Sequence, residues 1–128
     1  MSYIYYNPNP LNKETGDCVI RAITKVTGRD WDSIFVDLFT IAYKEKDMMD
    51  KNYVWGSYLD SIGYTRHVIP DLCPECYTIK EFCLDNPIGT YIVATGTHVV
   101  AIEDGNYYDS WDSGNKTPIY YWEKENVK

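Results

Sequence analysis

The chain has 128 residues, 45% of them hydrophobic, and its 19 acidic and 12 basic side chains give a formal net charge of −7. This length predicts a single globular domain, residues 1–128, that buries roughly two thirds of its unfolded surface. The acidic excess argues against nucleic-acid binding, which depends on Lys and Arg neutralising phosphates. No apolar run reaches the ~18 residues of a membrane span and no signal-peptide pattern opens the chain, so we expect a soluble, cytoplasmic protein.

Three helices are predicted in the first half of the chain. A possible short strand, residues 3–6, leads into the loop Asn7-Pro8-Asn9-Pro10, where each proline removes a backbone donor and favours extended geometry before it. Apolar residues at helical spacing then predict helices over about residues 17–26, 31–43 and 51–62. Thr15-Gly16-Asp17 indicates a helix entry with a side-chain cap, Asp30 a cap for the second helix, and Gly63 the end of the third.

Strands and one short helix are predicted in the second half. Residues 64–69 alternate as a strand does, and Thr78 and Glu81 have the spacing of a capping box that opens a short helix to about Asp85. Further strands are expected over residues 91–94, around His98, around Asp109 and over residues 119–122. Helices first and an antiparallel sheet after them predict the α+β fold class.

Asp104-Gly105 is the strongest turn signal in the chain. A type I′ turn requires φ > 0 at both central residues, and Asp-Gly between two strand-like runs meets this requirement. A two-residue loop pairs Glu103 with Asn106 and therefore sets His98 opposite Trp111.

The register decides which carboxylate accompanies the histidine. Side chains alternate between the faces of a strand, so His98, Asp109 and Trp111 share one face and Asp112 takes the other. A three-residue loop would instead set His98 opposite Asp112. In the favoured register Asp109 can orient His98 and stabilise its imidazolium, and Trp111 can shield that contact from water. An ordinary core histidine beside a cross-strand aromatic is the alternative interpretation.

Cys18 is the candidate nucleophile. It falls in the first turn of the helix predicted over residues 17–26, where the partial positive charge of a helix N-terminus favours thiolate over thiol. His98 would complete the activation by taking the proton of the thiol or by holding the thiolate as an ion pair. The alternative is structural, because free cysteine is among the most buried residue types.

The order of these residues resembles the papain-like cysteine protease superfamily. Asp109-Ser110-Trp111 is similar to the family's Asn-Ser-Trp, and His98-Val99-Val100-Ala101 to its His-Ala-Val-Ala. Asn12 lies six residues before Cys18, the offset of the family's oxyanion-hole glutamine, with Asn9 as a fallback donor. The chain departs from the family in having Asn in place of that Gln and Asp as the third member. It is also similar to short cysteine hydrolases of phage and bacterial genomes.

The resemblance implies a papain-like fold, in which the nucleophile helix comes first and N-terminal helices pack on a C-terminal antiparallel sheet. It implies a thiol hydrolase that cleaves peptide, isopeptide or amide bonds through a thioester, with Cys18 as nucleophile, His98 as base and acid, and Asp109 as orienting residue. We expect no cofactor, a peptide or protein substrate, and a monomer that binds neither nucleic acid nor membrane. The alternative is a catalytically silent papain-like binding or effector module of phage or bacterial origin.

The other three cysteines, Cys73, Cys76 and Cys83, cluster within eleven positions. Without a secretory signal we expect reduced thiols. Cys73-Pro74-Glu75-Cys76 has the pattern of a zinc knuckle, and with His67 and Cys83 it could form a Cys₃His zinc site. Because only one knuckle is present and Cys83 falls on the apolar side of the predicted short helix, we expect packed thiols and no metal site.

Overall fold

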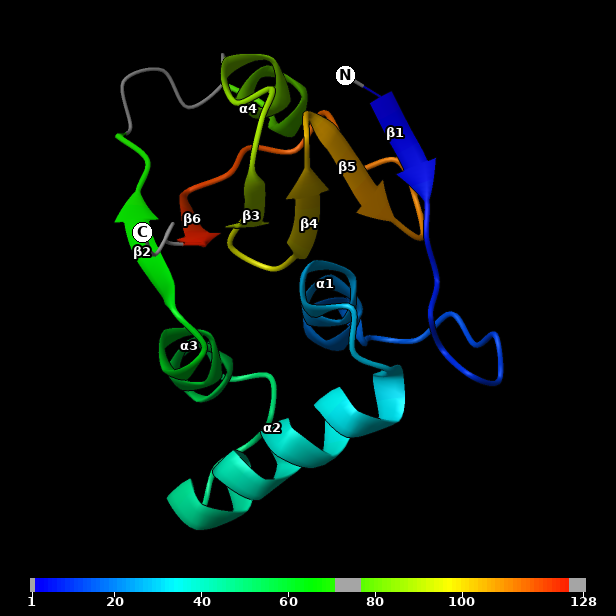
Figure 1. Cartoon of the computed structure of the whole chain (residues 1–128), viewed down its shortest axis with the longest axis vertical. Coiled ribbons are helices and arrows are strands. Elements are labelled where there is room, and N and C mark those ends of the chain that lie inside the picture. Colours follow the sequence, from blue (N-terminus) through cyan, green and yellow to red (C-terminus); the bar gives the residue numbers. More distant parts are fainter. Residues whose placement is uncertain (1, 71–76, 125–128) are drawn as a thin grey trace.

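The computed structural model describes residues 2–70 and 77–124. Its elements follow in the order β1 (Ser2–Tyr5), α1 (Cys18–Thr27), α2 (Trp31–Glu45), α3 (Asn52–Ser61), β2 (Tyr64–Val68), α4 (Ile79–Asp85), β3 (Thr90–Ala94), β4 (Val99–Glu103), β5 (Asn106–Asp109) and β6 (Tyr120–Lys124) (Figure 1). The α+β class is confirmed, and the bounds of the predicted elements differ by only one or two residues. No helix in the described part of the chain combines the length and hydropathy needed to cross a bilayer.

The strands form one open sheet in the order β1-β5-β4-β3-β6-β2. The pairs β5–β4, β4–β3, β3–β6 and β6–β2 are antiparallel, whereas β1 lies parallel to β5 at the edge. The sheet is therefore mostly antiparallel, and the expectation of a wholly antiparallel sheet after the helices is wrong at β1. A parallel pair needs a long crossover, which the chain between β1 and β5 supplies.

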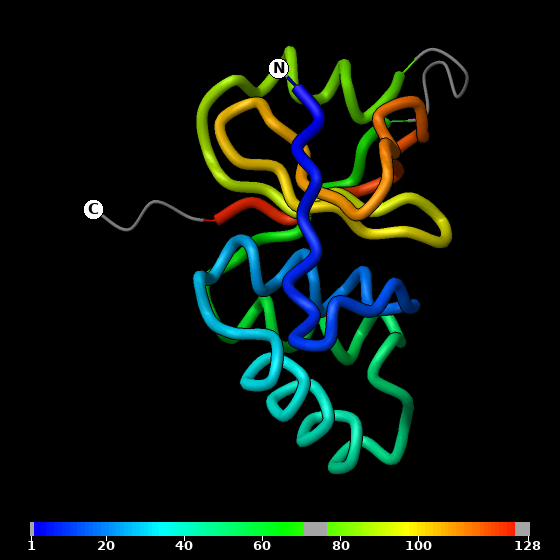
Figure 2. The backbone as a smooth tube through the Cα atoms, turned by 90° about the vertical axis from the view of Figure 1, so that its right-hand side faces the viewer, coloured from blue at the N-terminus to red at the C-terminus, as the bar shows by residue number. Residues whose placement is uncertain are grey.

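Helices cover both faces of the sheet (Figure 2). In this view the sheet lies between α4 above and α1, α2 and α3 below. Alternate residues of β3 separate the two cores, because Ile92 and Ala94 pack with α1–α3 while Tyr91 and Val93 pack with α4. The period-2 alternation of the strand thus explains how a short sheet buries two apolar layers.

Helix α1 packs across the centre of the sheet, against β3, β4 and β5. Six consecutive residues, 19–24, are buried, and Ile23 is 0% exposed. Full burial of an aliphatic side chain of this kind stabilises the fold by about 1.5–3 kcal/mol. The helix ends at Gly28, whose φ of 72° is left-handed and whose N–H donates to the Thr24 carbonyl. This packing fixes the N-terminus of α1, which carries Cys18, against the sheet.

The β4–β5 hairpin has the predicted turn. Asp104 and Gly105 have φ values of 50° and 77°, as a type I′ turn requires. The turn is held by Gly89, whose N–H donates to Asp104 Oδ1 at 3.0 Å and whose carbonyl accepts from the Asp104 N–H at 2.9 Å. The pairing confirms the predicted register: Glu103 opposite Asn106, Ile102 opposite Tyr107, and Ala101 opposite Tyr108.

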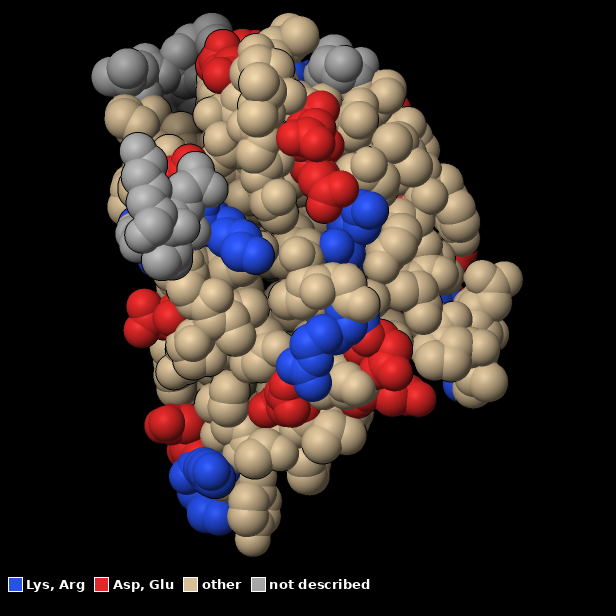
Figure 3. Space-filling model, viewed as in Figure 1, with Lys and Arg blue, Asp and Glu red and all other residues tan. Residues whose placement is uncertain are grey.

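Charged side chains of both signs are mixed on the face that Figure 3 presents. The basic side chains seen there lie next to acidic ones and form no continuous basic patch. Lys25 and Glu103, 3.8 Å apart, and Arg29 with Asp37 are ion pairs of this mixed kind.

Candidate active site

The N-terminus of α1, the turn before β4 and the segment after β5 meet at one cleft. The cleft has a volume of about 1450 Å³, and Cys18, His98 and Trp111 are among the residues that line it. Asp109 stands behind this wall, at the end of β5, with 0% of its surface exposed. The structure therefore brings the three candidate catalytic residues together from segments far apart in the chain.

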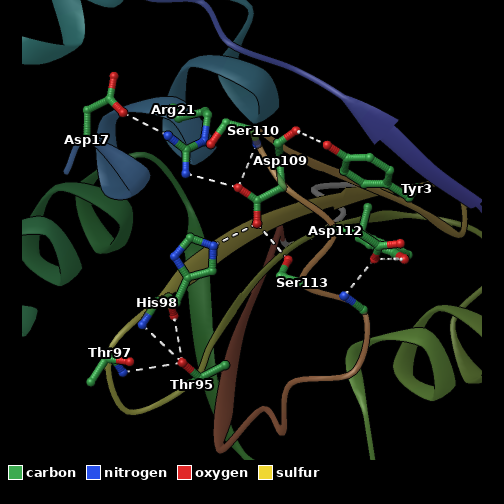
Figure 4. A network of polar contacts seen from close by, with 12 residues as sticks. Tyr3, Asp17, Arg21, Thr95, Thr97, His98, Asp109, Ser110, Asp112 and Ser113 are labelled. Atoms are coloured by element: carbon green, nitrogen blue, oxygen red, sulfur yellow. Dashed lines mark hydrogen bonds and ion pairs between the residues drawn. The ribbon is translucent and has the colours of Figure 1, made fainter. Parts of the chain in front are cut away.

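His98 lies one residue before β4, in the turn that joins β3 to β4. Its backbone N–H donates to Thr95 Oγ1 at 3.0 Å, and its carbonyl accepts from the Thr95 N–H at 2.8 Å. Its Nε2 is 2.6 Å from Oδ2 of Asp109 (Figure 4). The side chain of Cys18 lies close enough to the same ring that each group shifts the pKa of the other, and Nδ1 is the ring nitrogen that Asp109 does not engage. The imidazole thus connects the thiol with the buried carboxylate.

The carboxylate of Asp109 is fully engaged although no water reaches it. Oδ2 lies 2.6 Å from His98 Nε2 and accepts from Ser113 Oγ at 2.6 Å. Oδ1 accepts from Arg21 at 3.0 Å and from the Ser110 backbone N–H at 2.8 Å (Figure 4). Burial alone would raise the pKa of this carboxyl, but these contacts hold the pKa below its ordinary value. Asp109 is therefore a buried anion aimed at His98.

The Cys18 thiol and the His98 imidazole, both at the cleft surface, favour each other's charged forms. Burial alone would raise the pKa of the Cys18 thiol, but His98, the Val99 backbone N–H and Arg21 bring that pKa below its ordinary value. Burial alone would lower the pKa of His98, but Asp109 and Cys18 raise it to about 9. These opposite shifts favour a thiolate–imidazolium pair at neutral pH, which is the reactive state of a cysteine nucleophile.

The strand pairing expected between His98 and Trp111 is not formed, because the β4–β5 ladder ends at Ala101 opposite Tyr108, but the two rings still meet. The Trp111 ring lies over His98, with the ring centroids 4.8 Å apart and the planes inclined at 34°. Asp112 turns away, and its Oδ1 accepts from the Tyr107 hydroxyl at 2.5 Å and from the Gly114 N–H at 3.1 Å. The carboxylate beside His98 is that of Asp109.

Arg21 is a site residue that the sequence interpretation missed, and Asp17 has a different role from the one expected. Asp17 precedes α1, but its side chain makes no cap hydrogen bond, so the predicted side-chain cap is wrong. Its Oδ1 instead accepts from Arg21 at 2.7 Å, and its Oδ2 from Trp31 Nε1 at 2.9 Å. An arginine inside an apolar helical stripe, four residues after an aspartate, was the available signal, because a buried charge must be paired.

The candidate oxyanion donor Asn12 is not brought to the cleft. Asn12 is exposed, has a left-handed φ of 56°, and donates its backbone N–H to the Asn9 carbonyl at 2.9 Å. The described residues that line the cleft include Asn9 and not Asn12. Asn9 Oδ1 accepts from the Leu11 N–H at 2.9 Å, which orients the amide and leaves its NH₂ group to act as donor. The fallback donor is therefore the one that borders the cleft.

The residues considered for a zinc site have other surroundings where they are described. Cys83 is 1% exposed in the α4-side core, and burial raises the pKa of its thiol to about 11. His67 Nε2 lies 3.3 Å from Glu123, and its ring stacks on Tyr121. Cys73 and Cys76 lie outside the described residues. Within residues 2–70 and 77–124, no group of three or more His, Cys, Asp or Glu side chains is placed to hold a metal ion.

A thiol, an imidazole and a buried carboxylate arranged in series have the geometry of a nucleophile with its base and orienting group. Comparison with protein-family models, curated proteins and solved structures finds no match to this chain. The chemistry of the site is therefore inferred from its own residues.

Proposed function

We propose that this protein is a papain-like cysteine hydrolase that cleaves peptide, isopeptide or amide bonds. The observation that carries the proposal is the His98 ring between the Cys18 thiol and the buried Asp109 carboxylate, with 2.6 Å from Nε2 to Oδ2. The position of Cys18 as the first residue of α1, a helix packed on a mostly antiparallel sheet, supports the papain-like arrangement.

Acylation begins with the Cys18 thiolate. Its sulfur attacks the carbonyl carbon of the substrate, so that a C–S bond forms and the carbonyl π electrons move to the oxygen. The intermediate collapses when the C–N bond breaks and the His98 imidazolium gives its Nδ1 proton to the leaving nitrogen. The products of this half-reaction are an amine and a thioester on Cys18.

Deacylation uses the same groups in reverse. Neutral His98 takes a proton from water while the water oxygen attacks the thioester carbon, and the C–S bond then breaks to release the acid. The proton stays on His98, so the thiolate–imidazolium pair is restored. Asp109 keeps the ring in one orientation and stabilises its charge throughout.

The oxyanion needs hydrogen-bond donors that do not move during the reaction. The Cys18 backbone N–H opens α1 and lies outside the hydrogen-bond ladder of the helix, so it is one such donor. The second in our proposal is the side-chain amide of Asn9, which borders the cleft. Loss of one such donor typically lowers turnover by ~10²–10³.

The shape of the cleft supports a peptide or protein substrate. It is open to solvent and has an apolar wall on its α2 side, formed by Trp31, Phe35, Met48 and Met49. Apolar walls with a few polar groups are typical of ligand sites, and here the polar groups are those around Cys18.

Reaction with an epoxide-type thiol inhibitor at mild pH tests the proposal. We expect one adduct per chain, mapped by mass spectrometry to Cys18, abolished in Cys18→Ser and slowed in His98→Ala. Cys83→Ala, which changes a buried thiol in the other core, is the matched control and keeps the wild-type rate. Labelling of Cys18 that is no faster than labelling of the other thiols would instead support a catalytically silent binding module.

A further inference from the structure

A chain of buried charges runs from α2 to the candidate acid. Asp17 pairs with Arg21 at 2.7 Å, and Arg21 reaches Asp109 at 3.0 Å (Figure 4). Trp31 Nε1, at the start of α2, donates to Asp17. Asp17, Arg21 and Asp109 are 5%, 4% and 0% exposed. Three charged groups removed from water in this way are costly unless each is held by several contacts, as these are.

The guanidinium makes the two ion pairs with different nitrogens. NH1 donates to Asp17 Oδ1, and NH2 donates to Asp109 Oδ1. Such a rigid fork holds two carboxylates at a fixed separation, which the single ammonium of a lysine does not. Arg21 is three residues after Cys18, so the turn of α1 that carries the thiol also carries this fork.

Ser113, the Ser110 N–H and His98 also contact the Asp109 carboxylate. Of its partners only Arg21 comes from α1, the element that bears Cys18. Stability alone gives no reason for the arrangement, because well-packed apolar residues often replace buried ion pairs without loss of stability.

We propose that Arg21 is a positioning residue, whose guanidinium ties the Asp109 carboxylate to the first turn of α1 and so aligns Asp109, His98 and Cys18. The inference rests on the proposed function, because it identifies what aligns that site.

The charge of Arg21 acts on several groups at once. The titratable groups around it are Asp17 and Cys18 at the start of α1, His98 before β4, Asp109 on β5, and Tyr3 on β1, whose hydroxyl donates to the Asp109 carbonyl at 3.2 Å. A guanidinium keeps its charge at every accessible pH. Its removal disfavours the Cys18 thiolate and takes from Asp109 Oδ1 the hydrogen bond of Arg21, which leaves that of the Ser110 N–H.

Two measurements separate the charge of Arg21 from its positioning effect. The first is the rate of Cys18 alkylation by iodoacetamide as a function of pH. The second is the proton NMR resonance of the His98 Nε2–H, which a short hydrogen bond to Asp109 shifts downfield. Both are made on the wild type, Arg21→Met, Arg21→Lys and the control Arg29→Met, which removes a surface ion pair with Asp37.

In Arg21→Met we expect the acidic limb of the alkylation profile to move to higher pH, and the downfield resonance to be lost. Arg21→Lys returns the acidic limb of the alkylation profile to its wild-type pH because lysine keeps the positive charge. It does not restore the downfield His98 resonance, because a lysine ammonium cannot hold two carboxylates at a fixed separation as the guanidinium does. If Arg21→Met does not fold, as judged by circular dichroism, the comparison of Arg21→Lys with the wild type carries the test. Arg29→Met changes neither measurement.

Two results would overturn the inference: wild-type behaviour of Arg21→Met in both measurements, or recovery of the resonance in Arg21→Lys. Either can occur while wild-type Cys18 still reacts at low pH, and the proposed function then stands. If wild-type Cys18 does not react at pH values below the ordinary pKa of a thiol, the proposed function fails.

Discussion

Replacing Asp109 with Asn is the sharpest perturbation of the site. The amide keeps the shape of the side chain, removes its charge, and leaves Arg21 paired with Asp17. His98 then loses the anion 2.6 Å from its Nε2. We expect the thiolate–imidazolium pair to become less populated while the fold is retained.

The magnitude follows from the titration of His98. Its contacts with Asp109 and Cys18 raise its pKa from the ordinary 6.5 to about 9. One pKa unit corresponds to about 1.4 kcal/mol, so the imidazolium is favoured by roughly 3 kcal/mol, shared between the two partners. If Asp109 supplies half of this or more, Asp109→Asn lowers the equilibrium constant for forming the thiolate–imidazolium pair from the neutral thiol and imidazole by on the order of 10–100-fold.

The assay is the rate of Cys18 alkylation at pH 7 under conditions in which the wild type reacts to completion. Asp112→Asn is the matched control, because it changes an exposed carboxylate three residues later that bonds to Tyr107 and Gly114. We expect the control to stay within a few-fold of the wild type. A rate for Asp109→Asn within that range, or a larger loss in Asp112→Asn, would refute the assignment of the acid while leaving Cys18 and His98 as candidates.

Three further predictions concern the donor, the linkage to pH and the metal. Asn9→Ala should reduce turnover of a peptide amide substrate by ~10²–10³, and Asn12→Ala should reduce it by no more than a few-fold. Equal effects of the two substitutions would remove Asn9 from the oxyanion hole. In a Cys18→Ser background, which removes the opposing titration of the thiol, Asp109 still raises the folded-state pKa of His98, though less than the two partners together do in the wild type. The stabilising contribution of His98 is then complete below pH 6.5 and is lost as pH rises through that raised pKa. Urea unfolding of Cys18→Ser with and without His98→Gln should therefore show a larger difference at pH 6 than at pH 9, and a constant difference would contradict the linkage. Protein purified without added zinc should contain far less than one equivalent of metal, and a chelator should leave its Tm unchanged; one tightly held zinc per chain would instead indicate a zinc site at His67, Cys73, Cys76 and Cys83.

The parts of the site that depend on local signals could be predicted from the sequence. The φ values that Asp104 and Gly105 adopt determine the loop length, and the loop length determines the register that places Asp109 near His98. Cys18 at the start of a helix follows from the apolar periodicity of residues 19–26.

Contacts between distant segments were out of reach of the same reasoning. The parallel pairing of β1 with β5 joins residues about a hundred positions apart, and Arg21 meets Asp109 across 88 positions. Neither leaves a periodic signal in the chain. Asp17 shows how competing contacts override a local preference, since a side-chain cap was predicted but its carboxylate instead pairs with Arg21 one turn later and accepts from Trp31 on the next helix.

The loop before α1 shows why a family offset is a weak guide to position. Asn12 has the expected spacing from Cys18, yet its left-handed backbone and exposed turn place it off the cleft, while Asn9 borders it. A loop with two prolines and several asparagines is shaped by its own turn contacts, which spacing along the chain does not encode.

The most direct test of a nucleophilic Cys18 is to map which of the four thiols reacts first with limiting iodoacetamide at pH 6. Burial alone would raise the pKa of the Cys18 thiol, but His98, the Val99 backbone N–H and Arg21 hold that pKa below its ordinary value, whereas burial raises that of Cys83 to about 11. We predict that Cys18 carries nearly all of the label and that His98→Ala abolishes this preference. Preferential labelling of Cys73, Cys76 or Cys83 would contradict the proposed thiolate–imidazolium pair.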